Sequence, residues 1–322
     1  MARYVIYGAG SVGGIVGARL ADAGHDVLLI ARGPHYDALA TSGLRIDSPD
    51  GTQVYELAVV DHPRRGGIQP SDVVVLAVKS QHTESALVAL SDAAGPEVTV
   101  VCAQNGVENE RTALRRFAQV YGCLVVLPAS HLEPGVVTHC AGPVPGILDV
   151  GAVPAGRDDQ AQRISEDLRA AGFASDVVED VMAWKRRKLL LNLSNAIDAL
   201  FAPSEATERL GDRAREEARA CFAAARLASV AESAFEQRLA IFREQRYDER
   251  LSSGSSSWQS LARGVGNIEA DYLNGEIVLL GRLHNIPTPV NAALQRLANE
   301  QAARHNAPGT LDVGAIDAML AG

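Results

Sequence analysis

The first half of the chain alternates short apolar runs with amphipathic stretches, whereas the second half has helical patterning almost throughout. Apolar runs of about four to eight residues are typical of strands buried on both faces of a parallel sheet. Four such runs lie at Tyr4–Tyr7, His25–Ile30, Asp72–Val78 and Glu97–Ala103. Because strands that alternate with helices build α/β folds, we expect a doubly wound α/β domain at residues 1–180 and an all-helical domain at residues 181–322.

Shorter strands are expected elsewhere in the first half. Leu44–Ile46 and Gln53–Val60 should pair across Ser48–Gly51, since Pro, Asp and Gly there favour a turn. Three more strands, separated by Gly and Pro, should extend the sheet in antiparallel fashion: Gly122–His131, Gly135–His139 and Gly146–Val150. The remaining elements are two helices and a last strand: Pro34–Ser42, Asp158–Ala171 and Ala174–Val178.

Helix dominates after residue 180. Trp184–Leu200 contains neither Gly nor Pro and its apolar residues recur at helical spacing, so one buried helix is expected there. Further helices are expected at Glu205–Ala234, Ile268–His284 and Val290–His305. Ser252–Ser257 is the most linker-like stretch, and a flexible joint is one interpretation of its serines.

The charge balance argues against two classes of partner. The 322 residues include 30 basic and 39 acidic side chains, a net charge of −9, which disfavours nucleic acid and anionic membrane surfaces as partners.

The four cysteines have no metal-binding spacing with one another or with histidine, so no metal site is expected. Free thiols in a reducing cytoplasm are the simplest interpretation. No apolar segment approaches the roughly 20 residues of a membrane span, and none has the length of a signal-peptide core.

A glycine-rich turn follows the first strand directly, and it reads Gly8-Ala9-Gly10-Ser11-Val12-Gly13. A strand, a GxGxxG turn, a helix and a second strand within about 30 residues form the dinucleotide-binding unit of a Rossmann-type domain. The first glycine permits the tight turn, the second lets the backbone approach a pyrophosphate, and the third allows close helix packing. The predicted cofactor contacts are Gly8, Gly10, Ser11, Val12 and Gly13. The alternative is a glycine-rich turn without a ligand.

The end of the second strand indicates which dinucleotide binds. An NAD-selective unit usually has an acidic residue there, which binds the ribose 2′-hydroxyl. This chain has Arg32 instead, and a guanidinium can form paired hydrogen bonds to a 2′-phosphate. NADPH is therefore the expected cofactor. Lys79 and Asn105 also follow buried strands, where ligands lie in doubly wound sheets, although either residue alone could simply belong to a turn.

Three polar side chains share one face of the Trp184–Leu200 helix. At about 100° per residue, Lys188, Asn192 and Asn195 fall within roughly 60° of one another. A solvated face with a chance lysine is one interpretation. The leucines around this face indicate a buried helix instead, where unpaired polar groups are costly, so we expect a functional site.

Five motifs resemble, in their order and spacing, those of the ketopantoate reductase (2-dehydropantoate 2-reductase) family. They are GAGSVGG, AVKS, QNG, KLLLN, and EADYLNGEI followed by IPTP. The resemblance covers nearly the whole chain and implies a Rossmann domain joined to a helical domain like that of 6-phosphogluconate dehydrogenases. It implies NADPH-dependent reduction of a 2-oxo acid to a 2-hydroxy acid in pantothenate biosynthesis, with Arg32 and Lys79 at the cofactor phosphate.

The resemblance also implies roles around the substrate. Lys188 takes the position of the family's general-acid lysine, and Asn192 that of the asparagine one turn later. Glu269 matches the glutamate that binds the substrate hydroxyl, and Asn105 the asparagine near the nicotinamide, where it adjoins cofactor and substrate.

Two departures from the family pattern lie around the substrate rather than the cofactor. The second asparagine of the helix is expected at position 196, where this chain has alanine, and Asn195 on the same face is the nearest substitute. The carboxylate-binding serine is Ser256 when counted from the downstream Trp-Gln pair and Ser257 when counted back from Glu269. Ser256 is preferred.

The sequence therefore predicts an NADPH-dependent reductase of a small 2-oxo acid, with 2-dehydropantoate as the first candidate and a cytoplasmic location. One alternative is a reductase of another branched 2-oxo acid. The other is a non-catalytic NADPH sensor, which would need the glycine turn and Arg32 but would have no use for the face with Lys188. A homodimer stays open, and the tail from residue 306 to 322 is given no role.

Overall fold

The computed structural model describes residues 2–244 and 254–320, which form two compact units. Unit 1 contains the residues up to Gln104, Asn109–Met182 and helix α9 (Glu232–Glu244), and unit 2 contains the other described residues. The boundary lies two residues after the expected one at residue 180, and two segments belong to the other unit. The turn at Asn105–Glu108 belongs to unit 2, and α9 belongs to unit 1 although it follows the first helices of unit 2 in the chain.

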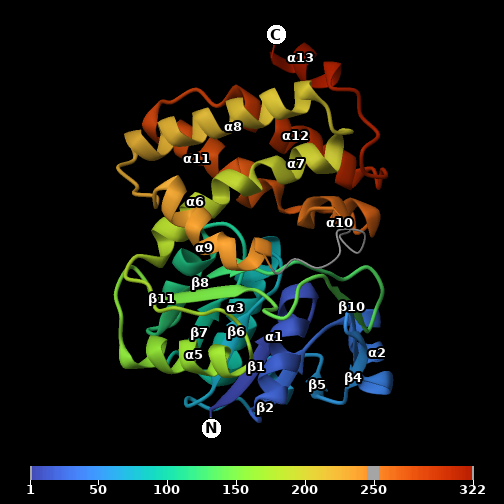
Figure 1. The fold of residues 1–322 in the computed structure, drawn as a ribbon, viewed down its shortest axis with the longest axis vertical. Coiled ribbons are helices and arrows are strands. Elements are labelled where there is room, and N and C mark those ends of the chain that lie inside the picture. Colours follow the sequence, from blue (N-terminus) through green and yellow to red (C-terminus); the bar gives the residue numbers. More distant parts are fainter. Residues whose placement is uncertain (1, 245–253, 321–322) are drawn as a thin grey trace. The chain divides into compact units, whose positions relative to one another are not determined.

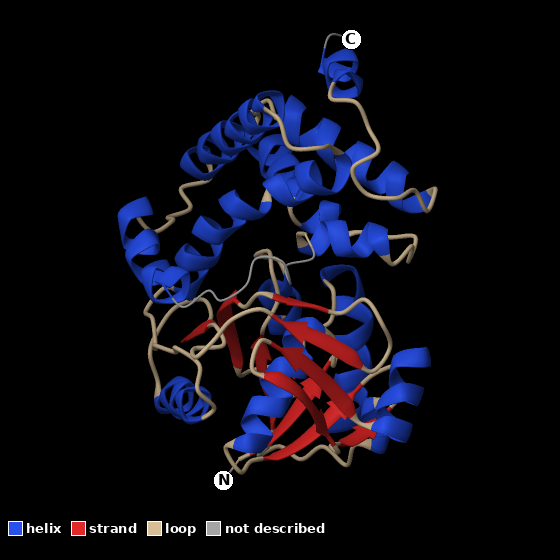
Figure 2. Ribbon diagram, turned by 45° about the vertical axis from the view of Figure 1, so that its right-hand side comes forward, coloured by secondary structure: helices blue, strands red, loops and turns tan. Residues whose placement is uncertain are grey.

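The core of unit 1 is a seven-stranded sheet of order β11-β8-β7-β6-β1-β2-β5 (Figures 1 and 2). Its strands are β1 (Arg3–Tyr7), β2 (Asp26–Ile30), β5 (Ala58–Val60), β6 (Val73–Leu76), β7 (Thr99–Cys102), β8 (Val120–Val126) and β11 (Ile147–Ala152). All pairs in it are parallel except β11 with β8. Ile6 lies opposite Leu29 on one side and Val75 on the other, so the central strand is paired along both edges.

Helices cover both faces of this sheet. Alternate residues of β1 serve different cores, because successive side chains of a strand point to opposite faces: Tyr4 and Ile6 pack with α1 and α5, and Val5 and Tyr7 with α3 and α4. The helices of unit 1 other than α9 are α1 (Ser11–Asp22), α2 (Gly33–Ser42), α3 (Thr83–Ala94), α4 (Asn109–Leu114) and α5 (Asp159–Ala170), with 3₁₀ turns η1 (Pro63–Arg65) and η2 (Ser80–His82). The doubly wound α/β architecture is confirmed.

The smaller strands differ from the expectation. β3 (Leu44–Ser48), β4 (Gly51–Tyr55), β9 (Ala129–Ser130) and β10 (Val136–His139) form a second sheet of order β4-β3-β10-β9. β11 extends the main sheet in antiparallel fashion, as expected for Gly146–Val150. β8, within Gly122–His131, also extends the main sheet but lies parallel to β7, and Gly135–His139 forms β10 of the second sheet, so the antiparallel extension was wrong for these two segments. The predicted strand Gln53–Val60 is divided between β4 and β5, which lie in different sheets. Ala174–Val178 forms two isolated bridges to β11 instead of a strand.

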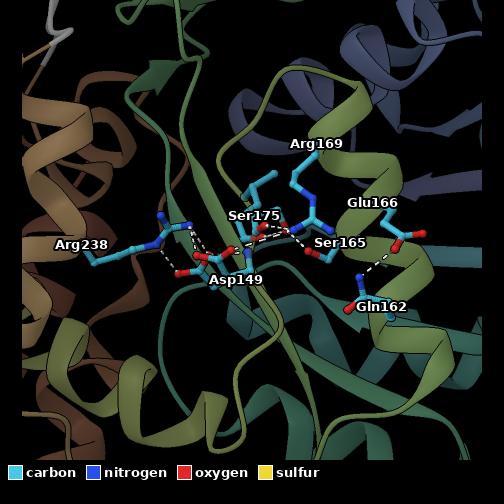
Figure 3. A network of polar contacts seen from close by, with 9 residues as sticks. Asp149, Gln162, Ser165, Glu166, Arg169, Ser175 and Arg238 are labelled. Carbon is cyan, nitrogen blue, oxygen red and sulfur yellow. Dashed lines mark hydrogen bonds and ion pairs between the residues drawn. The ribbon is translucent and has the colours of Figure 1, made fainter.

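Helix α9 is attached to unit 1 by a buried ion pair (Figure 3). The Arg238 guanidinium donates from Nε and Nη2 to the two carboxylate oxygens of Asp149 on β11, at 2.9 and 2.6 Å. Only 1% of the Asp149 side chain is exposed. The hydrogen bonds to Asp149 raise the pKa of Arg238 above its ordinary value. This pair explains physically why α9 belongs with the sheet.

Unit 2 is helical (Figure 2), and its helices are shorter than the sequence pattern predicts. They are α6 (Val181–Asn192, whose first two residues belong to unit 1), α7 (Ser194–Leu200), α8 (Glu205–Ala224), α10 (Ser256–Ala262), η4 (Glu269–Tyr272), α11 (Asn274–His284), α12 (Pro289–Ala303) and α13 (Gly314–Leu320). The expected single helix at Trp184–Leu200 is interrupted at Leu193. α8 ends ten residues before the predicted end, where Arg226 adopts a left-handed conformation with φ 54° that stops a helix.

One further expectation for the second half was wrong. Ile268–His284 is a 3₁₀ turn followed by α11, not one helix. Within the described ranges, no helix is long and apolar enough to cross a membrane.

Candidate active site

The three motif glycines in the turn of unit 1 differ in the space that is left for a side chain. A Cβ at Gly8, whose φ is +104°, would lie 2.7 Å from the backbone nitrogen of Val78, and a Cβ at Gly13 would lie 2.1 Å from the carbonyl oxygen of Gly8. A Cβ at Gly10 would meet only His131 Nδ1, at an ordinary 3.6 Å. The fold therefore needs Gly8 and Gly13, whereas space is left in front of Gly10. No side chain caps the start of α1 there, so the turn fits a pyrophosphate.

The predicted phosphate contacts follow neighbouring strands of the same sheet. The turn at Gly8 follows β1, exposed Arg32 follows β2, and Lys79 follows β6, in the strand order β6-β1-β2. Because the carboxyl ends of parallel strands meet at one edge, these three segments share that edge. The positive charge of Arg32 opposes the burial that raises the pKa of Tyr7, which places that charge near the end of β1.

A buried polar network, which the sequence patterns did not reveal, joins two of the predicted motifs. Gln104 Nε2 donates to the carbonyl oxygen of Val78 at 2.7 Å and to Thr83 Oγ1 at 2.8 Å. Thr83 Oγ1 donates to Asn109 Oδ1 at 2.7 Å, and Asn109 Nδ2 donates to Ser80 Oγ at 3.3 Å. The network fixes the loop after β6 to the loop after β7. The only signal in the sequence is the run of small polar residues after each buried strand.

A second feature without a sequence signal is a histidine pair beside the glycine turn. His35 Nε2 donates to the carbonyl oxygen of Ala9 at 2.8 Å, and His35 Nδ1 accepts from the amide of Gly135 at 2.9 Å. The ring of His131 lies 4.2 Å from that of His35. These contacts hold the glycine turn from the side of the second sheet.

In unit 2, Lys188 is brought to Asn105. Lys188 Nζ donates to Asn105 Oδ1 at 2.7 Å. Gly106, with φ +79°, lets the turn approach the 3₁₀ segment, since a Cβ there would lie 3.0 Å from the carbonyl oxygen of Tyr272. Segments from the QNG, KLLLN and EADY motifs thus meet within one unit.

The two asparagines of the predicted polar face differ in their positions. Asn192 lies one turn after Lys188 on α6, and its Oδ1 is buried without a hydrogen-bond partner in the described structure. Asn195 lies beyond the interruption, on α7, and its backbone carbonyl accepts from Ser255 Oγ at 3.3 Å. The expected single helix is thus divided, and the two asparagines lie on consecutive helices, although Leu193 between them keeps helical dihedral angles (φ −60°, ψ −27°).

The serine segment and the EADY motif meet in the same unit. Ser256 Oγ donates to Glu269 Oε2 at 3.2 Å, and the Glu269 residue is only 4% exposed. Ser257 is buried, whereas Ser256 is partly accessible. Burial lowers the pKa of Arg263, and the charge of Glu269 opposes that shift, so a cation that the sequence patterns did not indicate lies near this carboxylate.

The linker interpretation of the serine stretch is wrong for its described part. Ser255 caps α10 by accepting from the amide of Trp258 at 3.2 Å, and its own amide donates to Asp198 Oδ2 at 2.8 Å. Ser252 and Ser253 lie outside the described residues. All four cysteines are buried thiols outside disulfide bonds: Cys102, Cys123, Cys140 and Cys221. In the described part of the chain, no group of three or more His, Cys, Asp or Glu side chains could hold a metal ion.

Comparison with known proteins gives concordant matches for both halves. Residues 4–155 match the family described as Ketopantoate reductase PanE/ApbA, and residues 180–302 match its C-terminal counterpart. A 2-dehydropantoate 2-reductase of Mesorhizobium japonicum is 30% identical, with 93% of this chain and 98% of that protein covered. One from Pyrococcus horikoshii is 29% identical, with 92% and 96% covered.

Solved structures agree in fold. The crystal structure of a PanE/ApbA family ketopantoate reductase from Ralstonia eutropha matches with a TM-score of 0.78 and 29% identity, over 94% of this chain and 99% of that one. A D-mandelate dehydrogenase bound to NADH and anilino(oxo)acetate matches with a TM-score of 0.80 over 94% of this chain and 99% of that one. Its identity is 19%, so this second likeness concerns the fold alone.

Proposed function

The chain belongs to the ketopantoate reductase family, and on that premise we propose that it reduces a small 2-oxo acid, 2-dehydropantoate, to the 2-hydroxy acid with NADPH. The observation that carries the proposal is the hydrogen bond of 2.7 Å from Lys188 Nζ to Asn105 Oδ1. It fixes the ammonium group of Lys188, and one turn later on α6 the buried amide oxygen of Asn192 has no hydrogen-bond partner in the described structure. A positioned cation with an open hydrogen-bonding group one turn along the helix suits a carbonyl that becomes an alkoxide.

Lys188 is the general acid of the proposed reaction. NADPH, when bound, supplies the hydride that the C2 carbonyl carbon accepts. Lys188 donates a proton from Nζ to the carbonyl oxygen, and its positive charge stabilises that oxygen while negative charge develops. Asn105 accepts a hydrogen bond from Nζ and so orients the ammonium. The Asn192 side chain, one turn further along α6, hydrogen-bonds the substrate.

Substrate recognition is assigned to the partly buried groups of the same unit. Glu269 accepts a hydrogen bond from the substrate hydroxyl. This bond replaces the one that its carboxylate accepts from Ser256 Oγ in the structure. Ser256 Oγ donates to the substrate carboxylate instead. Asn195 adds a contact from α7. Ser256 is preferred over Ser257 because the Ser257 side chain is buried.

The glycine turn and its flanking cations are assigned to NADPH. The space in front of Gly10 and the uncapped start of α1 at Ser11, Val12 and Gly13 receive the pyrophosphate. Arg32 and Lys79, which follow strands on either side of β1, hold the 2′-phosphate. Asn105, which contacts Lys188, also adjoins the nicotinamide.

The rival functions differ from this one in specific residues. A sensor that binds NADPH without chemistry would need the glycine turn but not the contact between Lys188 and Asn105. A reductase of another branched 2-oxo acid would keep Lys188 but would not need a hydroxyl acceptor at Glu269. The position of Glu269 opposite Ser256 favours a hydroxylated substrate.

The test of the proposed function follows NADPH absorbance with a panel of 2-oxo acids. The panel includes 2-dehydropantoate and the same acid without its 4-hydroxyl group. We expect 2-dehydropantoate to give the highest kcat/KM, and we expect Glu269→Ala to impair it far more than the analogue. No turnover with any 2-oxo acid, despite NADPH binding, would favour the sensor. Equal losses on both substrates would remove the role given to Glu269.

A further inference from the structure

The interruption between α6 and α7 lies next to the proposed catalytic residues. α6 ends at Asn192 and α7 begins at Ser194, one residue before Asn195. Leu193 keeps helical dihedral angles, with φ −60° and ψ −27°, and its amide donates to the carbonyl oxygen of Leu189 at 3.0 Å, so the helix is interrupted at this single residue. The stretch has no Gly or Pro, and Ser194 begins α7. A side chain from elsewhere in unit 2 contacts the backbone at the interruption.

That contact comes from Asn274, the asparagine of the EADYLNGEI motif. Asn274 Nδ2 donates to the carbonyl oxygen of Leu193 at 3.2 Å and to Asn291 Oδ1 at 3.0 Å. Asn291 Nδ2 in turn donates to the carbonyl oxygen of Ala214 at 3.0 Å and to Glu217 Oε2 at 2.7 Å. Asn274 and Asn291 are both fully buried. These hydrogen bonds connect α8, α11 and α12 to the interruption at Leu193.

Glu217 determines which groups donate and which accept in this series of hydrogen bonds. Its carboxylate also accepts from the backbone amides of Val290 at 2.8 Å and Asn291 at 3.0 Å, at the start of α12 where helical amides lack internal partners. An ionised carboxylate only accepts hydrogen bonds. Asn291 must therefore turn its amide nitrogen to Glu217 and its oxygen to Asn274. Asn274 must then donate, and its second N–H is directed at Leu193.

We propose that Asn274 is a positioning residue for catalysis. It holds the interruption at Leu193 and thereby sets the directions of Asn192 and Asn195 relative to Lys188. The inference rests on the proposed function, because it concerns the geometry of that site. The competing explanation is that the network only packs the four helices together. In that case its loss would lower stability without a specific effect on turnover.

The test compares Asn274→Ala with Thr207→Ala in the full chain. Thr207 belongs to the capping box of α8 in the same unit, so its loss weakens a helix without touching the interruption. Both variants are assayed well below their melting temperatures. We expect Asn274→Ala to lose at least about tenfold in kcat, an effect of the size seen when a site is displaced slightly. The affinity for NADPH should stay within about twofold in both variants, as should kcat in Thr207→Ala, because distant sites act independently.

A double-mutant cycle separates positioning from general destabilisation. If Asn274 acts through Asn192, the loss from Asn274→Ala should shrink to less than about threefold in an Asn192→Ala background, because coupled residues are non-additive. Equal losses in both backgrounds would overturn the proposal. So would an Asn274→Ala enzyme that is folded and as active as Thr207→Ala.

Two further measurements keep the outcome decisive. If Asn274→Ala does not fold, Asn274→Leu replaces it in the comparison, because it keeps a branched side chain and removes the amide donors without burying a charge. Hydrogen exchange is read at the amides of residues 194–196. Faster exchange there in the Asn274 variant than in Thr207→Ala supports the proposal even if the parent chain reduces no 2-oxo acid. In that case only the proposed function fails, whereas unchanged exchange overturns the positioning role itself.

Discussion

The glycines of the cofactor turn illustrate how one motif combines folding and binding at single residues. Gly13→Ala should lower the free energy of unfolding, because its Cβ would lie 2.1 Å from the Gly8 carbonyl oxygen. Gly10→Ala should fold normally, because its Cβ meets only His131 at 3.6 Å, but it should weaken NADPH binding by filling the space for the pyrophosphate. Calorimetric melting and NADPH titration check both. Full NADPH affinity in Gly10→Ala would contradict the assignment of this turn.

The second prediction at this scale concerns cofactor choice. NADPH should bind more tightly than NADH, because Arg32 stands where an acidic ribose contact is usual. A charge-assisted hydrogen-bonded pair contributes about 1.5–3 kcal/mol, so Arg32→Ala should reduce the preference by at least about tenfold. Lys79→Ala is the matched variant and should reduce it in the same direction. Equal affinities for the two cofactors in the unmutated protein, measured by titration, would remove the argument.

His139 predicts how stability depends on pH. It is 1% exposed, burial lowers its pKa from the ordinary 6.5, and its Nε2 donates to the Pro145 carbonyl oxygen at 2.9 Å. At pH values between the lowered pKa of the folded state and the ordinary pKa of the unfolded state, the unfolded chain binds more protons than the folded one. The stabilisation is therefore complete above about pH 6.5 and is lost as the pH falls through the folded-state pKa. Urea unfolding at pH 7.5 and 5.5 should show this loss, and His139→Gln should reduce the difference. An unchanged difference would mean that other groups cause it.

At the scale of elements, the strands β1, β2, β6 and β7 were predictable because all of their apolar residues are buried. The interruption at Leu193 was not, because Asn274, which contacts it, lies 81 residues later in the chain. The second sheet was missed for a similar reason: β3 pairs in parallel with β10, about 90 residues away. Local periodicity carries no information on such contacts.

The ion pair of α9 gives a prediction at the same scale. Removal of Arg238 leaves the buried Asp149 carboxylate without its cation (Figure 3), and breaking a buried pair in this way costs about 3–5 kcal/mol. Arg238→Ala should lower the free energy of unfolding by about that amount in denaturant titrations. The control is Arg169→Ala, whose exposed pair with Asp176 spans 4.0 Å and should contribute less than about 1 kcal/mol. Equal losses in the two variants would show that burial of Asp149 is not the cause.

At the scale of the whole molecule, the motifs located the candidate residues but not their neighbours. Lys188, Asn105, Ser256 and Glu269 carry their own signals in the sequence, and the structure brings the first two together and the last two together. The polar network around Thr83 and Asn109 has no motif, because its members are recognisable only once two loops meet. The division into units also depends on a distant contact, since α9 returns to the sheet. A homodimer stays open, and the mass measured by sedimentation would decide between one chain and two.

The assignment of the general acid to Lys188 has a specific competitor on the same helix. Lys185 is the nearest competitor of Lys188, but it is only 4% exposed and has Leu189, not an amide, four residues later. Because it is buried, Lys185→Met is a better control than alanine, since it keeps the apolar stem. Lys188→Ala should fold and bind NADPH, because the glycine turn and Arg32 hold the cofactor in unit 1.

The most direct test is kcat for 2-dehydropantoate, per folded molecule, in Lys188→Ala and Lys185→Met. Loss of a general acid that also stabilises the alkoxide should lower kcat by roughly 10²–10⁴ in Lys188→Ala. Lys185→Met should stay within a few-fold of the parent enzyme. The reverse result, with turnover abolished in Lys185→Met and retained in Lys188→Ala, would contradict the assignment of the catalytic lysine and of the site built around it.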